Sequence, residues 1–234
     1  MAIIDWLYPK HCPVCLSVLP PGDTLICEEC IPKIRRVSEP VCFKCGKPLS
    51  DETKEFCSDC ARRMPPFASG IVYAEYSSKY VRRMLSEVKY HRNRQLLDYP
   101  CEDFAKRSEE TVKAWGAEAL IPVPVHVSRL RERGYNQAEE IAKRLGRIWK
   151  IPVDAHYLIR HEKTAAQKTL DDTARFMNLL HAFSVAGEEG RYRSVILVDD
   201  IYTTGSTLFA CTKVLQEAGV PLVHTVVLAA GRDR

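Results

Sequence analysis

The chain has 234 residues, of which 34 are basic and 30 acidic, and 46% are hydrophobic. This composition is typical of a folded, soluble protein and argues against a disordered chain. The sequence has no apolar run of the roughly 18 residues that a membrane span needs, and its start lacks the basic leader of a secretory signal, so we expect a cytoplasmic protein. The net charge of +4 is too small to indicate a nucleic-acid partner by itself.

Eight of the ten cysteines form four Cys-x-x-Cys pairs at regular spacing: Cys12/Cys15, Cys27/Cys30, Cys42/Cys45 and Cys57/Cys60. Two thiolates at this spacing can face one metal ion, and two pairs complete the tetrahedron of thiolates that structural zinc prefers. A disulfide framework is the alternative, but such frameworks belong to small secreted domains, whereas a long segment with few cysteines follows here. We therefore predict two structural zinc ions.

The cysteine pairs belong to a longer repeat. Residues 12–30 match residues 42–60, and each unit has an apolar residue, Ile26 or Phe56, just before its second pair. This pattern looks like a double zinc ribbon that depends on metal for folding. Two pairings fit the spacing: the first pair with the second and the third with the fourth, or a cross-braced arrangement that joins the first pair with the third.

The character of the sequence changes at Met64-Pro65-Pro66, so we predict a zinc-ribbon domain over 1–64 and a second domain over 65–234. In the second part, short apolar segments alternate with amphipathic ones. Strands are expected at 71–76, 119–125, 153–159, 194–198 and 222–230, and helices near 81–88, from 100, from 136 and over 208–218. This alternation predicts an α/β domain with a parallel, doubly wound sheet.

The strongest motif of the second domain is the segment 195–207. An apolar strand ends in two carboxylates, Asp199 and Asp200, and a helix then begins within a polar turn made of Thr203, Thr204, Gly205, Ser206 and Thr207. The carboxyl end of a parallel strand is where open α/β sheets bind ligands, and a helix N-terminus binds anions. Because carboxylates accept hydrogen bonds from sugar hydroxyls, the combination predicts a site for a ribose 5-phosphate. The alternative, a merely polar turn, would leave two carboxylates at the end of a buried strand without a partner.

A second polar segment, 121–137, follows another expected strand. It carries Arg129, Arg131 and Arg133 in an expected loop before a helix. Three guanidinium groups suit a pyrophosphate or another polyanion. A solvated basic turn is the alternative, but the segment lies where a second ligand loop of the same sheet is expected.

The segment 198–207 closely resembles the phosphoribosyl-pyrophosphate (PRPP) motif of type I phosphoribosyltransferases. Further motifs resemble the ComF family, which is named from DNA uptake during bacterial transformation. They are Leu7-Tyr-Pro, Val88-Lys-Tyr-His-Arg, Ile121-Pro-Val-Pro, Arg133-Gly-Tyr-Asn-Gln-Ala, Thr164 with Gln167, and Arg175 with Asn178. His91-Arg-Asn departs from the family pattern, which often has a small residue there.

This resemblance implies that Asp199 and Asp200 hold the ribose hydroxyls, that the turn 203–207 holds the 5-phosphate, and that Mg²⁺ binds with the pyrophosphate. It also implies a mobile loop near residues 160–178 over the ligand. A transferase acting on PRPP is one expectation. The alternatives are a single-stranded DNA-binding module, favoured by six basic residues and two tyrosines within 79–94, and an assembly module that docks a DNA-import helicase.

Overall fold

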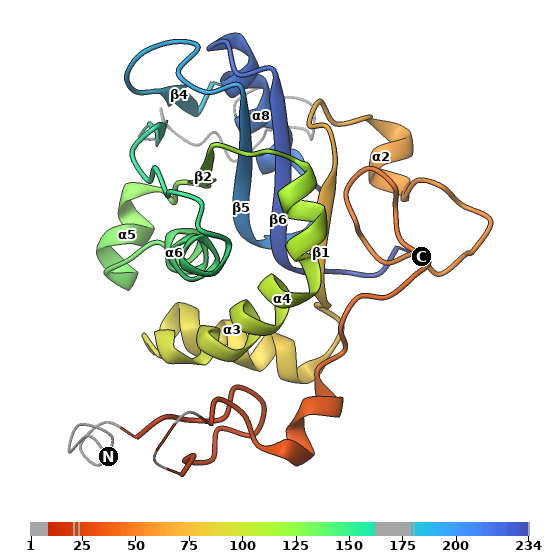
Figure 1. Ribbon diagram of the computed structural model, residues 1–234, viewed down its shortest axis with the longest axis vertical. Coiled ribbons are helices and arrows are strands. Elements are labelled where there is room, and N and C mark those ends of the chain that lie inside the picture. Colours follow the sequence, from red (N-terminus) through yellow and green to blue (C-terminus); the bar gives the residue numbers. More distant parts are fainter. Residues whose placement is uncertain (1–8, 21, 23, 162–178, 180, 234) are drawn as a thin grey trace, which may run out of the picture.

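The computed structural model describes residues 9–20, 22, 24–161, 179 and 181–233 (Figure 1). Its helices are η1 (Glu28–Lys33), α2 (Ser58–Arg62), α3 (Lys79–Tyr90), η2 (Arg94–Leu97), α4 (Asp98–Ala114), α5 (Val127–Arg133), α6 (Gln137–Trp149) and α8 (Ser206–Glu217). Its strands are β1 (Gly70–Glu75), β2 (Ala119–Pro122), β3 (Leu158–Arg160), β4 (Phe183–Val185), β5 (Ser194–Tyr202) and β6 (Leu222–Ala230).

Four strands form a sheet in the order β1-β6-β5-β2, and every pair in it is parallel. The predicted class, an α/β fold with a parallel sheet, is confirmed. Strand β2 ends at Pro122 opposite Val198. The segment after Pro122 and the acidic pair after Val198 therefore leave the sheet at the same edge. Strands β3 and β4 form a separate antiparallel hairpin.

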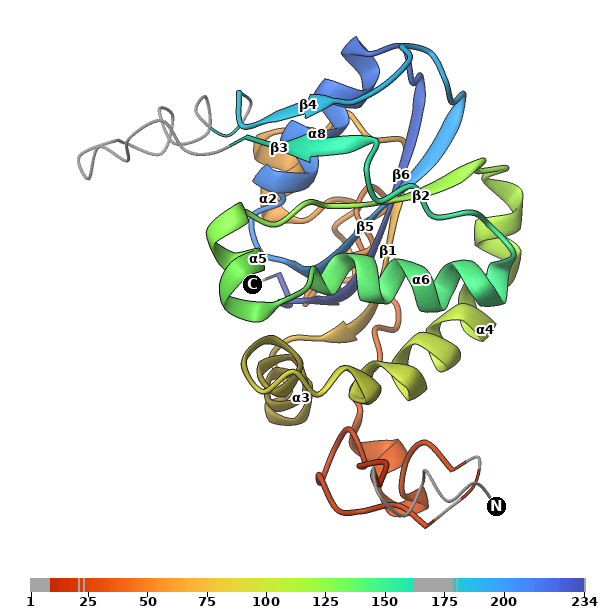
Figure 2. The ribbon, with the colours of Figure 1, turned by 90° about the vertical axis from the view of Figure 1, so that its left-hand side faces the viewer.

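Helices cover both faces of the sheet because β5 is apolar on both sides. Ile196 and Val198 pack in the core that contains residues of α3, α4 and α6, whereas Val195 and Leu197 pack in the core that contains α8. Figure 2 shows α3, α4 and α6 on one side of the strands and α8 on the other. A strand buried on both faces reads as a continuous apolar run, which is why β5 could be predicted from the sequence.

Two expected strands differ from the observed ones. The strand expected at 119–125 ends at Pro122, because Pro122 and Pro124 have no N–H to donate to a neighbouring strand. In the segment expected at 153–159, Val153 makes one isolated bridge and β3 begins only at Leu158. The Asp154 side chain accepts a hydrogen bond from the backbone two residues later, a local turn that interrupts an extended segment.

The two cysteine units lie in different parts of the molecule. The first packs with residues of α3 and α4, and the second packs with residues of α8 and β1 (Figure 1). The chain between the units runs along β1, where Val37 N donates to Tyr73 O and Glu75 N donates to Arg35 O, both at 2.8 Å. This connection pairs with the outer edge of β1, so that edge of the sheet is not open to another chain. None of the helices among the described residues combines the length and the apolar character needed to cross a bilayer.

Candidate functional site

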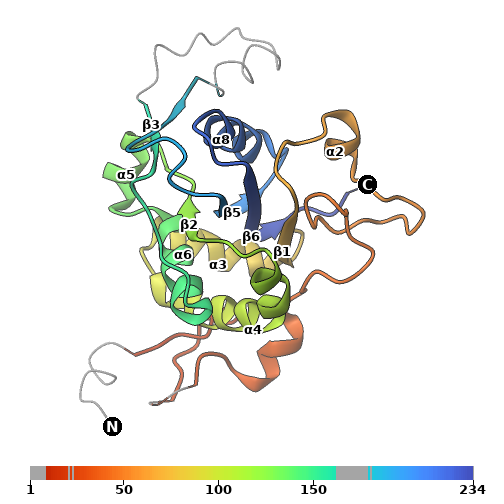
Figure 3. The same ribbon diagram turned by 45° about the horizontal axis from the view of Figure 1, so that its top comes forward.

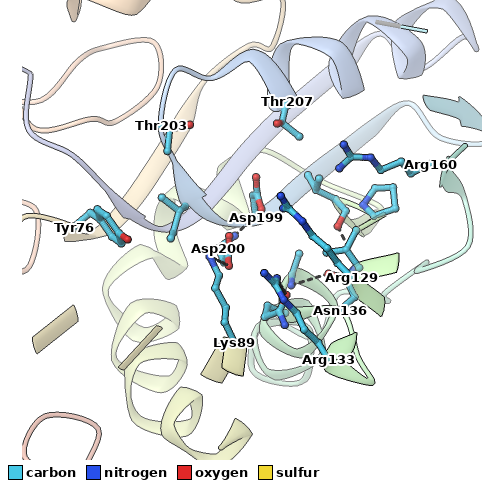
Figure 4. Close-up of a pocket in the computed structure, with 16 residues that line it drawn as sticks. Tyr76, Lys89, Arg129, Arg133, Asn136, Arg160, Asp199, Asp200, Thr203 and Thr207 are labelled. Atoms are coloured by element: carbon cyan, nitrogen blue, oxygen red, sulfur yellow. Dashed lines mark hydrogen bonds and ion pairs between the residues drawn. The ribbon is translucent and has the colours of Figure 1, made fainter. Parts of the chain in front are cut away.

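A cavity of about 260 Å³ lies at the carboxyl ends of β2 and β5 (Figure 4). This is the edge of a parallel sheet at which open α/β folds bind ligands. Most of its wall is polar or charged, and the lining side chains come from five parts of the chain. The polar ones are Tyr76, Lys89, Arg129, Arg133, Asn136, Gln137, Arg160, Asp199, Asp200, Thr203 and Thr207.

The two acids lie at the centre of this cavity. The backbone N–H of Asp200 donates to Asp199 Oδ1 at 2.8 Å, and Asp200 Oδ2 lies 2.6 Å from Lys89 Nζ. Burial and then the negative charge of Asp200 raise the pKa of the Asp199 carboxyl to about 8. At neutral pH the pair therefore carries a proton on Asp199, and Asp200 is paired with a lysine. The two acids are thus not equivalent.

The polar turn after the acids has the geometry of an anion site. Gly205 is the N-cap of α8 with φ 73°, and no side chain caps the helix, so its first N–H groups are available to a ligand. A side chain at Gly205 would overlap the Tyr202 ring behind it, so only glycine fits. Thr203 and Thr207 line the cavity. The hydroxyls of Thr204 and Ser206 lie 3.0 Å apart on the exposed side of the turn.

The three arginines of the second motif are separated by the structure. They lie in the short helix α5, not in a loop as expected from the sequence. Arg129 and Arg133 are four residues apart and line the cavity together, whereas Arg131 is exposed and is not one of the lining residues. Helical periodicity is the reason, because residues i and i+4 share a face and residue i+2 does not.

The start of α6 is fixed by contacts to two neighbouring segments. Asn136 caps the helix by accepting from Ala138 N at 3.1 Å, and its amide donates to Val123 O at 3.0 Å. The Tyr135 hydroxyl donates to the Val88 carbonyl of α3. Gln137 is 2% exposed, and its Oε1 accepts from Arg133 Nη1 at 2.9 Å. Among the described residues, Gln137 Nε2 and Arg133 Nε are buried donors that have no hydrogen-bond partner.

Five polar lining residues were not among the predicted site residues: Tyr76, Lys89, Asn136, Gln137 and Arg160. Lys89 was grouped with the basic stretch 79–94, but its side chain turns into the cavity (Figure 4). Its position beside Val88, a buried residue of α3, was the available signal. Burial and then the charge of Arg129 lower the pKa of Arg160, so two like charges crowd this wall. The other expected loop residues, Thr164, Gln167, Arg175 and Asn178, lie outside the described residues.

The eight paired cysteines form two separate clusters. One contains Cys12, Cys15, Cys27 and Cys30 and the other Cys42, Cys45, Cys57 and Cys60, with ligand atoms within 4.8 Å of one another. The sequential pairing is thus the observed one, and all ten cysteines are free thiols. Sulfur separations of 3.8 Å (Cys15–Cys27) and 3.7 Å (Cys45–Cys57) match the edge of a tetrahedron with zinc–sulfur bonds of about 2.3 Å. The donor set therefore fits two structural zinc ions.

The second cluster is bound to the C-terminal residues. The Asp233 carboxylate, 4% exposed, accepts from Ser58 N at 3.0 Å and from Ser58 Oγ at 2.5 Å, and Lys47 Nζ lies 3.8 Å away. Arg232 donates to Leu49 O at 2.6 Å. Figure 3 shows the C-terminus next to α2 and far from α5. This cluster is therefore part of the α/β core and not a separate lobe.

Comparison with known proteins agrees with both halves of this description. A family model described as a double zinc ribbon domain matches residues 3–61, and one described as a phosphoribosyl transferase domain matches residues 124–234. The boundary that we predicted at 64/65 falls between these matches and stays a prediction. A purine phosphoribosyltransferase from Pyrococcus horikoshii Ot3 aligns with 56% of this chain and 74% of its own, at 16% identity. Its TM-score of 0.37 is too low to support a conclusion.

The fold and the cysteine clusters define a double zinc ribbon joined to a phosphoribosyltransferase-type domain. Competence protein F of Haemophilus influenzae is 33% identical over 94% of this chain and 95% of its own. Competence protein ComFC of Bacillus subtilis is 28% identical over 84% and 80%, and DNA utilization protein YhgH of Escherichia coli O157:H7 is 26% identical over 92% and 95%. The chain belongs to the ComF family.

Proposed function

We propose that the cavity binds PRPP together with Mg²⁺, and that the protein takes part in DNA uptake during natural transformation. The observation that carries the proposal is the order of chemical groups across the cavity. An uncapped helix N-terminus lies at one end, two acids lie in the middle, and the cationic side chains of Lys89 and Arg133 lie at the other end (Figure 4). A 5-phosphate, the ribose hydroxyls and a pyrophosphate match these three parts in turn.

The distribution of charge supports a ligand with two anionic groups. The turn 203–207 has no charged side chain, so it would hold a phosphate through N–H groups and hydroxyls alone. The cavity also contains Lys89, Arg129, Arg133 and Arg160, which together exceed its two acids. A ribose with a single phosphate, held at the turn, would place no anion beside Lys89 and Arg133 at the far end. A diphosphate at the far end would supply acceptor oxygens and negative charge to both of these side chains.

Magnesium fits this arrangement through its preference for oxygen ligands. The ligand's pyrophosphate, the Asp200 carboxylate and, once it has lost its proton, the Asp199 carboxylate are the oxygens that could hold it, and it would neutralise charge on the leaving group. In a transferase reaction, the bond between the anomeric carbon and pyrophosphate breaks and the arginines stabilise the departing oxygens. The acids position the ribose through its hydroxyls. An acceptor nucleophile would then form the new bond to the anomeric carbon, in place of pyrophosphate.

Calorimetry with PRPP and Mg²⁺ tests the proposal. We expect saturable binding to the full chain, and we expect it to be lost when both Asp199 and Asp200 are changed to Asn. Asp51→Asn, an exposed acid in the second cysteine unit, is the matched control and should bind as the unaltered protein does. Release of pyrophosphate from PRPP in the presence of candidate acceptors then tests for catalysis, which Asp200→Asn should abolish. Equal binding by the double variant would refute the proposal.

A second candidate function, binding of single-stranded DNA, is favoured by the outer surface of α3 and the segment that follows it. Lys79, Arg82, Arg83 and Arg92 are exposed there, and the Tyr90 ring is 63% exposed. Exposed cations beside an aromatic ring suit phosphates and stacked bases. An Arg82/Arg83/Arg92 triple alanine variant should lose salt-dependent affinity for single strands while keeping its PRPP affinity. Unchanged DNA affinity would exclude this surface.

A further inference from the structure

Tyr202, the last residue of β5, lies directly behind the polar turn 203–207. Its side chain belongs to the core on the α8 side of the sheet and is 3% exposed. A Cβ added at Gly205 would overlap both the Tyr202 hydroxyl and the ring carbon that carries it. The ring therefore contacts the backbone of the residue that begins α8, and it limits where the first N–H groups of this helix can lie.

The second cysteine cluster is the other neighbour of the Tyr202 ring. Its four cysteines are buried in the same core as Tyr202, whereas Cys12 and Cys30 of the first cluster are buried in the core on the α3 side. Burial and then the negative charges of Cys45, Cys60 and Cys57 raise the pKa of the Tyr202 hydroxyl. Because the interaction between charges falls with distance, the hydroxyl is close to these sulfur atoms. One side chain thus lies between the second cluster and the polar turn.

The second cysteine unit is also fixed to the sheet. A Cβ added at Gly46 would lie 2.6 Å from Gly70 O, so the turn after the third cysteine pair packs with its backbone directly on the start of β1. On another side of the unit, Arg232 donates to Leu49 O at 2.6 Å and forms an ion pair with Glu75. With zinc bound, the cluster is therefore a rigid support behind the Tyr202 ring. Without metal, four sulfur ligands have nothing to hold them together, and the support loosens.

Resting on the proposed function, we infer that Tyr202 is a positioning residue through which the second zinc cluster fixes the polar turn for the phosphate of the ligand. Among the residues that the structure describes, Tyr202 is not one of those that line the cavity, so it acts on the ligand through Gly205. A coupling free energy between two sites is reciprocal. Zinc in the second cluster therefore strengthens binding at the turn, and a phosphate bound at the turn makes this zinc harder to remove.

Equilibrium removal of zinc by a chelator selective for zinc over Mg²⁺ tests the inference on the full chain. Cys27→Ser takes one ligand from the first cluster, so its remaining zinc reports on the second cluster alone. We expect saturating PRPP with Mg²⁺ to raise the chelator concentration that removes half of this zinc about fivefold or more. In the unaltered protein, PRPP should not change the concentration that removes the first zinc. An equal shift for both zinc ions would mean that the ligand only stabilises the whole fold, and would overturn the inference.

Variants of Tyr202 test whether the coupling passes through its ring. Tyr202→Leu should still bind two zinc ions, but we expect it to bind PRPP about tenfold more weakly and to lose the effect of PRPP on the second zinc. Tyr202→Phe keeps the ring and should retain both properties within about twofold. Tyr157→Leu is the matched control, because Tyr157 is a tyrosine of the same core, 1% exposed, whose ring packs edge-on against Tyr192. It should leave the effect of PRPP on zinc unchanged. If Tyr202→Leu keeps this effect, the inference is wrong.

A test without ligand separates the inference from the proposed function. Gly205→Ala forces a Cβ against the Tyr202 ring, so it should lower the chelator concentration that removes the second zinc about threefold or more with no PRPP present. Gly190→Ala, where nothing lies within 4 Å of the added Cβ, should leave this concentration unchanged. Equal zinc retention in the two variants would overturn the inference. If the unaltered protein binds no PRPP but Gly205→Ala still loosens the second zinc, the proposed function fails and the contact through Tyr202 stands.

Discussion

Lys89 Nζ and Asp200 Oδ2 lie 2.6 Å apart, and this ion pair joins the end of α3 to the end of β5 inside the cavity. Both side chains are largely buried, with exposed fractions of 17% and 15%. A buried carboxylate is costly without a partner. The pair therefore gives Asp200 a cationic partner inside the cavity, whereas burial and the charge of Asp200 raise the pKa of Asp199 to about 8. The two acids thus have different surroundings.

The raised pKa of Asp199 predicts a pH dependence of stability. The unfolded chain loses this proton near pH 3.8, whereas the folded protein keeps it up to about pH 8. Between these values the folded state holds one more proton, so its stability falls as pH rises, by up to about 1.4 kcal/mol per pH unit. Above the folded pKa the effect stops growing.

Asp199→Asn removes this titration. Urea unfolding at several pH values between 4 and 9 should therefore show the unaltered protein losing stability relative to the variant up to about pH 8. A constant difference between the two proteins across this range would mean that Asp199 is ionised throughout.

Gly205→Ala should disrupt the polar turn 203–207, which we propose holds the 5-phosphate. The residue has φ 73°, and an added Cβ would overlap the Tyr202 side chain. Gly190→Ala is the matched control, because its φ is 70° and nothing lies within 4 Å of the added Cβ. Both variants place an alanine in the left-handed backbone conformation, which destabilises each by about 1 kcal/mol. The difference between their free energies of unfolding therefore measures the overlap with Tyr202. We expect Gly205→Ala to be less stable in urea than the control and to lose PRPP binding. Equal effects in the two variants would show that the turn tolerates a side chain.

The two zinc clusters should differ in their effect on the ligand site. Cys57 is fully buried in the core that also contains Tyr202. The Tyr202 ring lies against Gly205 of the polar turn 203–207. Cys27 has the equivalent position in the first unit and is only partly buried. We expect each Cys→Ser variant to lose one zinc ion, measured by metal analysis. Only Cys57→Ser should lose PRPP binding and show a large drop in melting temperature. Loss of ligand binding in the Cys27 variant would contradict this view.

Asp233→Asn should weaken the contact between the second cluster and the C-terminal residues. The carboxylate accepts two hydrogen bonds from Ser58 and lies near Lys47, and Asp233 is 4% exposed. Replacing one oxygen with an amide NH₂ leaves a buried donor facing a donor. We expect a loss of about 1–3 kcal/mol in the free energy of unfolding, measured in urea. Asp51→Asn, a change at an exposed carboxylate that accepts from the nearby Thr53, should leave it nearly unchanged. Similar losses in the two variants would show that Asp233 is not buried in solution.

Features confined to one short segment could be predicted from the sequence. The cysteine pairs, the apolar strand β5 and the turn after it are each readable from spacing and residue type, because all their groups lie within a few residues. The pairing of the cysteines could not be predicted in this way, because two arrangements fit the spacing, and the structure shows the sequential one. Arg131 shows the limit of prediction from the sequence. Three arginines at alternate positions seemed equally able to bind an anion, but in the helix α5 Arg131 is on a different face from the two that line the cavity.

The sequence by itself determined the class of fold, the eight cysteines that can bind zinc and the acidic pair with its turn, whereas the structure decided which cysteines share a cluster. Only the tertiary structure decided that the two cysteine units lie on different faces of the sheet and that Lys89 turns inward to Asp200. It also decided that Gln137 and Arg133 hold buried donors without partners at the α3–α6 junction. The physical reason is that these contacts join segments far apart in the chain. Their geometry depends on how helices pack on the sheet, which local spacing does not encode.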